Sequence, residues 1–493
     1  MRVGGWLAVA ALGCAATAAA FADEVKPAGA KLAQETKKER ALLTTRMHHV
    51  TGDFDEMLKF RGLRMLVPYS RTLFFHDRGT AQGVAVQAAA ELEKRLNKKY
   101  PDKRPFTVVL VPTTRDQLIP LLLKGEGDVA AGNITITEAR DQQVDFTAPT
   151  ASNVSEIIVT GPGAPELRSL DDLAGKQVHV RPTTSYYESL TALNQRFQQE
   201  GKAPMELRPL PNELEDEDKL DMVNAGLIQI AVIDDWIAKI WAPYLKNVKL
   251  HPELAVRSGG QVAWGVRKEN PQLRAELDAF IAGGLKTGLD KVLMRNVTAA
   301  ARRMHNATAS EEMKKFETTL DFFRKYGGEY HFDYLMLAAQ GYQESRLDQN
   351  AKSHVGAIGI MQVMPETGKE LKVGDIKHPE NNVHAGTKYM AQLMERYFKD
   401  AKFDEQNRAL FAFASYNAGP GNIAKMRKRA AEEGLNPDVW LNNVEQVTAR
   451  RIGQEPVQYV RNIYKYYVAY KLAQQVTQQR NEALEKVKGG AAQ

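Results

Sequence analysis

The stretch FDYLMLAAQGYQESRLDQN, residues 332–350, has the spacing of an apolar helix with one acid near its end. Leu337, Gly341 and Glu344 recur at three- and four-residue intervals, which places them in one stripe of a helix that begins near Phe332. The polar residues that follow predict that the helix ends soon after the acid. The stretch therefore predicts a helix with a partly buried carboxyl group in its last turn or two.

The carboxyl group of Glu344 is expected to keep its proton up to near-neutral pH. Burial disfavours the charged form, and the partial negative charge at a helix C-terminus acts in the same direction. A carboxylic acid that stays neutral near pH 7 can donate a proton to a bound substrate. The same position also suits a structural acid capped by a neighbouring Ser or Arg, and helical spacing alone leaves both interpretations open.

The helical pattern continues to about residue 480. Apolar residues at helical spacing fill NNVHAGTKYMAQLMERYFKD, NRALFAFASYNAG and EPVQYVRNIYKYYVAYKLAQQ. We therefore expect a mainly α domain over residues 318–480. A helical linker is expected over 291–317, with a helix start at Ser310, and a polar tail over 481–493.

Four phrases of this region follow one another in order: GAIGIMQVMPETG, NNVHAGTKYM, FASYNAGPGN and EPVQYVRNI. With Glu344 and Ser345 they resemble the lytic transglycosylase domain of the soluble-transglycosylase family, which shares the goose-type lysozyme fold. The resemblance spans residues 320–475. It implies a lyase that cleaves the β-1,4 bond between N-acetylmuramic acid and N-acetylglucosamine in peptidoglycan and leaves 1,6-anhydromuramic acid ends.

The resemblance also implies a role for each matching residue. Glu344 would be the single catalytic acid and base. The implied substrate-binding residues are Ser345, Gln362, Tyr416, Asn417 and Tyr459. Ser415 stands where the family usually has alanine, and we expect this exchange of small residues to matter little.

Two other classes of function stay open. A lysozyme-like hydrolase would use Glu344 as the acid and either Glu366 or Glu455 as a base for water. A non-catalytic wall sensor would only bind glycan. No cofactor and no metal are expected, because the histidines of the domain lack the spacing of known ligand motifs. These histidines are His331, His354, His378 and His384.

Residues 61–290 carry a different pattern, in which short apolar strand segments alternate with helical ones. The strand segments are RMLVPYS, FTVVLVP, GDVAAG, KQVHVRP, IQIAVIDD and GQVAWGVRK. This alternation predicts an α/β fold with a parallel sheet. The acidic segment PNELEDEDKLD, residues 211–221, is interpreted as a charged loop.

This region resembles the family 3, amino-acid-binding type of extracellular solute-binding proteins. The matching phrases are GDVAAGNITITEARDQQVDFTAPT, DDLAGKQVHVRPTTSYYESL and IAVIDD. The resemblance implies two α/β lobes joined by crossing strands, with a ligand cleft between them. The expected fold class is thus a multidomain chain: a bilobal α/β periplasmic-binding-protein-like module followed by a mainly α, lysozyme-like domain.

The resemblance implies a set of ligand-binding residues in the cleft. They are Thr137, Arg140, Thr184, Ser185 and Asp235. Arg140 with Thr137 would hold a carboxylate, since a guanidinium matches a carboxylate with two hydrogen bonds, and Asp235 would hold an amino group. Thr184 and Ser185 begin a helix and would add N–H donors. A regulatory amino acid or muropeptide is the expected ligand.

Alternatives from the residues themselves also stay open in this module. Arg140 could form a surface ion pair with a neighbouring acid, and Asp235 could cap a helix. Arg181 and Pro182 depart from the family pattern, since small residues are usual at their positions. These departures leave the identity of the ligand open.

Residues 1–22 have the pattern of a secretory signal peptide, with Arg2, an apolar run and the small-x-small site at residues 20–22. We therefore expect export to the periplasm. Lipidation of Cys14, in the phrase ALGC, is an alternative, and peripheral attachment at the outer membrane stays open. Residues 23–60 are expected to be a polar spacer.

The composition is that of a globular protein, with 43% apolar and 26% charged residues. Apart from the signal-like segment, no run of residues is apolar for long enough to predict a membrane-spanning helix. The net charge of +6 suits an acidic polymer. Given the resemblance, the expected partner is the glycan strand of peptidoglycan and not nucleic acid.

Overall fold

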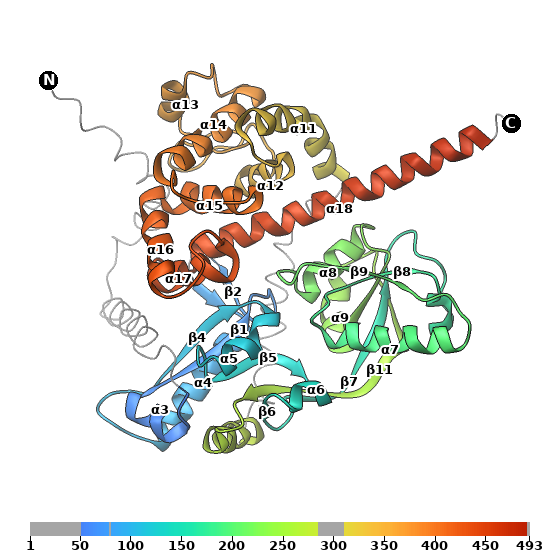
Figure 1. Ribbon diagram of the computed structural model, residues 1–493, viewed down its shortest axis with the longest axis vertical. Coiled ribbons are helices and arrows are strands. Elements are labelled where there is room, and N and C mark those ends of the chain that lie inside the picture. The colour runs from blue at the N-terminus through green and yellow to red at the C-terminus, as the bar shows by residue number, and fades with distance from the viewer. Residues whose placement is uncertain (1–50, 78–79, 284–309, 491–493) are drawn as a thin grey trace. The chain divides into compact units, whose positions relative to one another are not determined.

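The structure is a computed structural model that describes residues 51–77, 80–283 and 310–490. These residues form two units, which are described separately: the front module, residues 51–283, and the back domain, residues 310–490 (Figure 1). The predicted signal peptide, and most of the predicted spacer and linker, lie outside the described residues. Within the described ranges, no helix is both long enough and apolar enough to cross a membrane.

The front module is built on a mixed sheet with strand order β4-β1-β5-β11-β7-β10-β8-β9, and β6 pairs with β11. These strands are β1 (Gly62–Pro68), β4 (Thr107–Thr113), β5 (Val129–Thr135), β6 (Asp145–Phe146), β7 (Ala151–Thr160), β8 (Gln177–Val180), β9 (Glu206–Pro209), β10 (Ile230–Asp234) and β11 (Lys249–Val266). Strand β1 is parallel to β4 and β5, and β8 is parallel to β9 and β10, as the alternating pattern predicted. A separate hairpin pairs β2 (Phe75–Asp77) with β3 (Thr80–Gln82).

Strands β7 and β11 connect the two halves of this sheet, which are the two lobes of the module. Strand β11 pairs with β5 of the first lobe, β7 pairs with β10 of the second lobe, and β7 and β11 pair with each other (Figure 1). All of these pairs are antiparallel. The bilobal α/β arrangement with crossing strands is therefore confirmed.

Helices cover both lobes. They are α3 (Phe54–Phe60), α4 (Val84–Lys99), α5 (Leu118–Leu123), α6 (Glu138–Asp141), α7 (Ser185–Gln199), α8 (Asp216–Asn224), α9 (Asp235–Trp241) and a helical segment over residues 271–283. In the first lobe Leu122 of α5 packs in one cluster with Leu66 of β1. In the second lobe Phe197 of α7 packs with Val178 and Val232 of the sheet. Each lobe therefore has its own apolar core.

The interpretation of residues 211–221 as a charged loop was wrong. Helix α8 begins at Asp216, and Glu215, Asp216, Glu217 and Lys219 are at most 3% exposed. Charged residues are buried only when partners compensate for the lost hydration. Their partners come from distant parts of the module, as described below, and the local composition does not reveal them.

The back domain is mainly helical, which confirms its predicted class. Its helices are α11 (Ser310–Tyr330), α12 (Tyr334–Ser345), α13 (Pro365–Leu371), α14 (Pro379–Tyr397), α15 (Glu405–Ala418), α16 (Pro420–Glu432), α17 (Glu445–Arg451) and α18 (Gln454–Gly490). Helix α18 continues through most of the segment for which a polar tail was predicted. Among the described residues of this domain, β-pairing is limited to isolated bridges within residues 352–363.

Helix α12 lies between α11 and α18, which both pack against it. Asp333 caps its N-terminus by accepting a hydrogen bond from the N–H of Leu335. The helix ends at Ser345, because Arg346 takes a left-handed conformation and donates its N–H to the carbonyl of Tyr342. Glu344 thus lies in the last turn of a packed helix, as the spacing predicted.

Candidate active site and ligand cleft

Glu344 forms a direct hydrogen bond with Tyr459, which comes from α18. The Tyr459 hydroxyl donates to Oε1 of Glu344. Burial raises the pKa of Glu344 to about 7, although the hydrogen bond from Tyr459 acts to lower it. Near neutral pH the carboxyl group is therefore close to half protonated, so that it can both give and accept a proton.

Ser345 and Tyr416 both hold the loop that follows α12 in the site. The Ser345 hydroxyl donates to the carbonyl of Ile360 at 2.9 Å. The Tyr416 hydroxyl, on α15, donates to the carbonyl of Met361 at 2.8 Å. Two of the predicted substrate-binding residues therefore also fix this loop beside the end of α12.

Gln362 lies in the same loop, with a left-handed backbone conformation (φ 47°). Its side-chain Nε2 donates to the carbonyl of Gly359 at 2.9 Å and to that of Ala351 at 3.3 Å. The Gln362 amide is thus bound to the loop backbone. Asn417 follows Tyr416 in the last turn of α15 and is half-buried.

Asn382 organises this loop, and the sequence analysis did not single it out. Its side chain is fully buried on α14; Oδ1 accepts from the N–H of Met361 at 2.8 Å, and Nδ2 donates to the carbonyl of Ile358 at 2.9 Å. Gly359 passes so close that an added Cβ would lie 2.4 Å from Asn382 Nδ2. The signal in the sequence was an amide in the phrase NNVHAG, next to the buried apolar stripe of α14.

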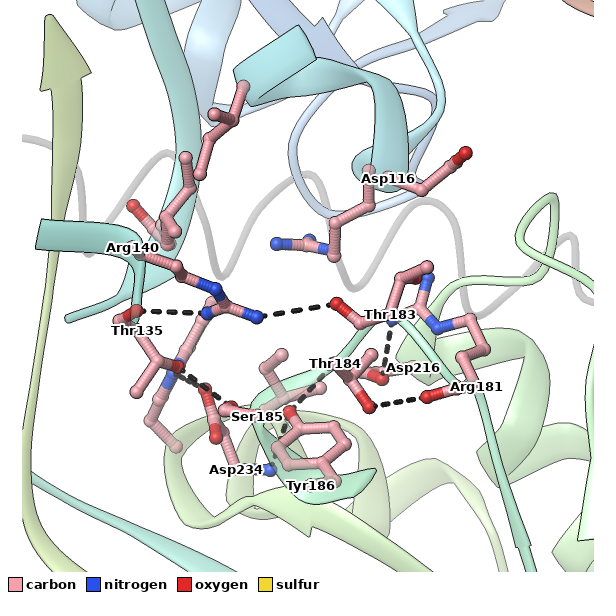
Figure 2. A pocket seen from close by; sticks show the side chains of 16 residues that line it. Asp116, Thr135, Arg140, Arg181, Thr183, Thr184, Ser185, Tyr186, Asp216 and Asp234 are labelled. Carbon is pink, nitrogen blue, oxygen red and sulfur yellow. Dashed lines mark hydrogen bonds and ion pairs between the residues drawn. The ribbon is translucent and has the colours of Figure 1, made fainter. Parts of the chain in front are cut away.

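In the front module a small cavity of about 110 Å³ lies between the lobes (Figure 2). Three of the five predicted ligand-binding residues line it: Arg140, Thr184 and Ser185. Arg140 donates to the carbonyl of Thr135 at 2.9 Å and to that of Thr183 at 3.3 Å. Ser185 donates to the Thr135 hydroxyl at 3.2 Å. The bonds from Arg140 to Thr183 and from Ser185 to Thr135 cross between the two lobes, whereas the bond from Arg140 to Thr135 lies within the first lobe.

The other two predicted residues, Thr137 and Asp235, are not among those that line the cavity. Thr137 precedes α6 as its N-cap. Asp235 begins α9, where it accepts from the N–H of Ser155 at 3.1 Å and pairs with Lys239. Asp234 lines the cavity instead, and burial together with nearby acids raises its pKa to about 7.

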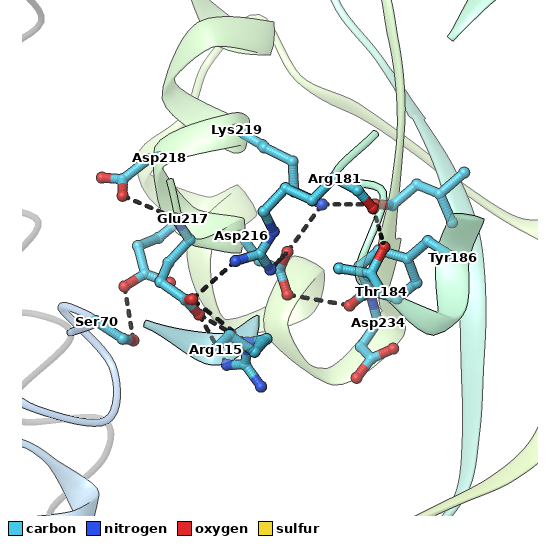
Figure 3. Close-up of polar contacts among 12 residues, drawn as sticks. Ser70, Arg115, Arg181, Thr184, Tyr186, Asp216, Glu217, Asp218, Lys219 and Asp234 are labelled. Carbon is cyan, nitrogen blue, oxygen red and sulfur yellow. Dashed lines mark hydrogen bonds and ion pairs between the residues drawn. The ribbon is translucent and has the colours of Figure 1, made fainter. Parts of the chain in front are cut away.

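A network of buried charges lies beside the cavity and joins the lobes (Figure 3). Arg181, at 1% exposed, bonds Glu215 at 2.8 Å and Asp216 at 3.2 Å within the second lobe. Arg115 of the first lobe bonds the other oxygen of Glu215 at 2.7 Å. Ser70 of the first lobe donates to Glu217 at 2.8 Å. Side chains of the chain itself therefore hold the lobes together across the cleft.

Comparison with known proteins agrees with this two-part organisation. Residues 65–294 match the model of the bacterial extracellular solute-binding proteins, family 3, and residues 321–439 match the model of the transglycosylase SLT domain. Fold and site together define the class: an SLT-type transglycosylase domain preceded by a solute-binding module. Tyr459 lies beyond the matched residues, and the fold brings it to Glu344.

Relatives that span most of the chain specify the family. A membrane-bound lytic murein transglycosylase F from Desulfosudis oleivorans is 30% identical over 71% of this chain and 79% of its own length. Proteins of the same name from Ectopseudomonas mendocina and Aeromonas hydrophila are 27% and 28% identical, each over 84% of this chain and over 85% and 83% of their own lengths. The chain belongs to the membrane-bound lytic murein transglycosylase F family.

The raised pKa of Glu344 predicts how substitution changes stability with pH. The stability that the acid gives the folded state is present below its ordinary pKa of 4.5 and is lost as the pH rises through about 7. The variant Glu344→Gln stays neutral, so at pH 8 it should exceed the wild type by about 2 kcal/mol in unfolding free energy. This figure is less than the full pKa difference implies, because the carboxyl group is only partly buried.

Denaturant unfolding at pH 4 and pH 8 measures this difference. The gain should vanish at pH 4, and the exposed-site variant Glu366→Gln should behave like the wild type at both values. An equal effect of Glu344→Gln at the two pH values would contradict the burial argument.

Proposed function

We propose that this chain, a peptidoglycan lytic transglycosylase by family, uses Glu344 as its single acid and base. The observation that carries the proposal is the half-buried carboxyl group at the end of α12, bonded to Tyr459 and with a pKa of about 7. A group that must donate a proton in one step and accept one in the next works best with its pKa near the working pH. The activity in the names of its relatives supports the same assignment.

In the first step, protonated Glu344 gives its proton to the oxygen that links N-acetylmuramic acid to N-acetylglucosamine, and the bond from C1 to that oxygen breaks. In the second step, the Glu344 carboxylate takes the proton of the C6 hydroxyl of the same muramic acid while that oxygen bonds to C1. The product is a 1,6-anhydro sugar, and no water is consumed. An attached nucleophile has an effective molarity of about 10⁵ M or more when well oriented.

The remaining predicted residues would bind and orient the glycan. Tyr459 would hold the Glu344 carboxyl group, and Ser345 and Tyr416 would keep the loop with Gln362 beside it. Asn417 and the Gln362 amide would turn to sugar hydroxyl or acetamido groups when a glycan strand is bound. Amide groups suit this task because each has both donors and an acceptor.

A hydrolase would need a second carboxylate as the base for water. Glu366 and Glu455, the two candidates, are both exposed, and neither shares a hydrogen bond with Glu344 or Tyr459 among the described contacts. The site therefore favours the reaction with an internal nucleophile.

Product analysis tests the reaction class. Purified cell-wall sacculi digested with the protein should release fragments that end in anhydromuramic acid, lighter by one water than reducing-end fragments. Mass spectrometry in oxygen-18 water should find no label at these ends. Labelled reducing ends as the main product would instead establish a hydrolase.

Loss of the carboxyl group tests the role of Glu344. The variant Glu344→Gln should lower turnover of sacculi by about 10³-fold or more, because both proton transfers need the same group. Sedimentation with sacculi should show unchanged binding, and Glu366→Gln should turn over like the wild type. Wild-type-like turnover of Glu344→Gln would remove this residue from the mechanism.

For the front module we propose a regulatory role. Its cleft would bind an amino acid or short peptide released from the wall, and this ligand would change the activity of the back domain. Arg140 would hold the carboxylate; Thr184 and Ser185 would add donors. The resemblance assigns the amino group of the ligand to Asp235 and places Thr137 beside Arg140 at the carboxylate. Asp234, however, is the acid that lines the cavity.

We further propose a periplasmic location with peripheral attachment at the outer membrane, which the term membrane-bound in the relatives' names supports.

Calorimetric titration with amino acids and stem peptides tests this role. Binding should be lost in Arg140→Ala, and comparison of Asp234→Asn with Asp235→Asn should identify the acid that holds the amino group. A coupling free energy of about 1–3 kcal/mol between the two sites would change wall cleavage by roughly 5- to 150-fold. Absence of binding, or binding that leaves cleavage unchanged, would contradict the regulatory role and leave the transglycosylase assignment intact.

A further inference from the structure

Gln340 is a fully buried amide one turn before Glu344 on α12. It stands among apolar and small neighbours, where an amide is unfavourable unless it is hydrogen-bonded. Its Nε2 donates to the hydroxyl oxygen of Tyr459 at 3.4 Å. Its Oε1 is buried and has no hydrogen-bond partner among the described residues. The one polar contact found for this side chain is therefore the tyrosine that bonds the proposed catalytic acid.

The three side chains form a directed chain of hydrogen bonds. Gln340 Nε2 is a donor, so the Tyr459 oxygen accepts from it and the Tyr459 proton is directed to Oε1 of Glu344. A hydroxyl group that accepts a hydrogen bond becomes a better donor to its next partner. The amide therefore strengthens the bond that stabilises the Glu344 carboxylate.

This direction matters for the chemistry. A Glu344 proton that pointed at Tyr459 would be turned away from the glycan. With Oε1 occupied by the tyrosine proton, the proton of the neutral acid resides on Oε2, for which the described residues show no hydrogen bond. That oxygen is then the one available to the substrate.

We propose that Gln340 is a positioning residue, which directs the Tyr459 hydroxyl to Oε1 of Glu344 and so presents Oε2 to the glycosidic oxygen. The inference rests on the proposed role of Glu344. It adds a residue outside the four phrases that carry the resemblance. Two titratable groups act on Tyr459, namely Glu344 and Tyr416 on α15, and Tyr459 in turn acts on Glu344.

The variant Gln340→Met tests the proposal, since methionine keeps the unbranched shape and removes the donor. With a weaker bond from Tyr459, the Glu344 carboxylate loses stabilisation and its pKa rises. In the profile of kcat/KM against pH, the alkaline limb, where the acid loses its proton, should move up by about 0.5 pH unit. The value of kcat should fall about 3- to 10-fold, with KM little changed.

A double-mutant cycle separates positioning from packing. In the Tyr459→Phe background, Gln340→Met should cause no further shift of the limb, because the amide acts through the tyrosine hydroxyl. Thr448→Val removes another fully buried hydroxyl, one that bonds the carbonyl of Val444, and should leave the limb in place. Thermal unfolding of every variant reports the loss of stability separately.

Two results would overturn the proposal: an unmoved limb in Gln340→Met, or an equal shift with and without the Tyr459 hydroxyl. A carbon-13 titration of the Glu344 carboxyl group gives the same pKa comparison without turnover. Wild-type protein that released no anhydro ends would instead contradict the proposed function. The two failures are therefore distinguishable.

Discussion

The back domain depends on one constraint: a carboxyl group has to be buried deeply enough to hold a proton near neutral pH and still remain within reach of a polymer. Helix α12 meets it by packing Leu337, Ala338 and Ala339 at zero exposure and ending at Ser345, one residue after Glu344. The left-handed turn at Arg346 opens the helix end at that point. The tyrosine from α18 then supplies one hydrogen bond without adding a charge.

A buried amide supports this site from a second side. Asn382 fastens the backbone of the loop that follows α12 through both Oδ1 and Nδ2, and Nδ2 also bonds the carbonyl of Ile376 in the segment between α13 and α14. Asn382 therefore holds in place the loop whose carbonyl groups accept hydrogen bonds from Ser345 and Tyr416. Prearranged groups of this kind need little reorganisation when a substrate arrives.

The parts of the structure that the sequence predicted are those whose signal is local. The helical spacing around Glu344 and the strand and helix alternation of the front module each lie within a short window. Strand β7 was not identified, because its first three residues are exposed and include the polar Ser152 and Asn153, although it is one of the two strands that join the lobes. Asp234 and Asp235 are adjacent acids, and only the position at which the chain turns after β10 decides which of them lines the cavity. Helix α8 was misjudged because the partners of its charges lie up to 150 residues away.

The ionic network around α8 has a consequence for how the front module responds to its surroundings. Mobile ions weaken attraction between charges that face water, with a screening length of about 8 Å at physiological ionic strength, but they act much less on pairs excluded from solvent. Arg181 and Glu215 are 1% and 3% exposed, and Lys219 beside them is fully buried. These charges lie within the second lobe, so added salt would leave their pairing intact, whereas Arg115, which reaches Glu215 from the first lobe, keeps 20% of its side chain exposed. Salt would therefore weaken the junction between the lobes while the charges buried in the second lobe stay paired.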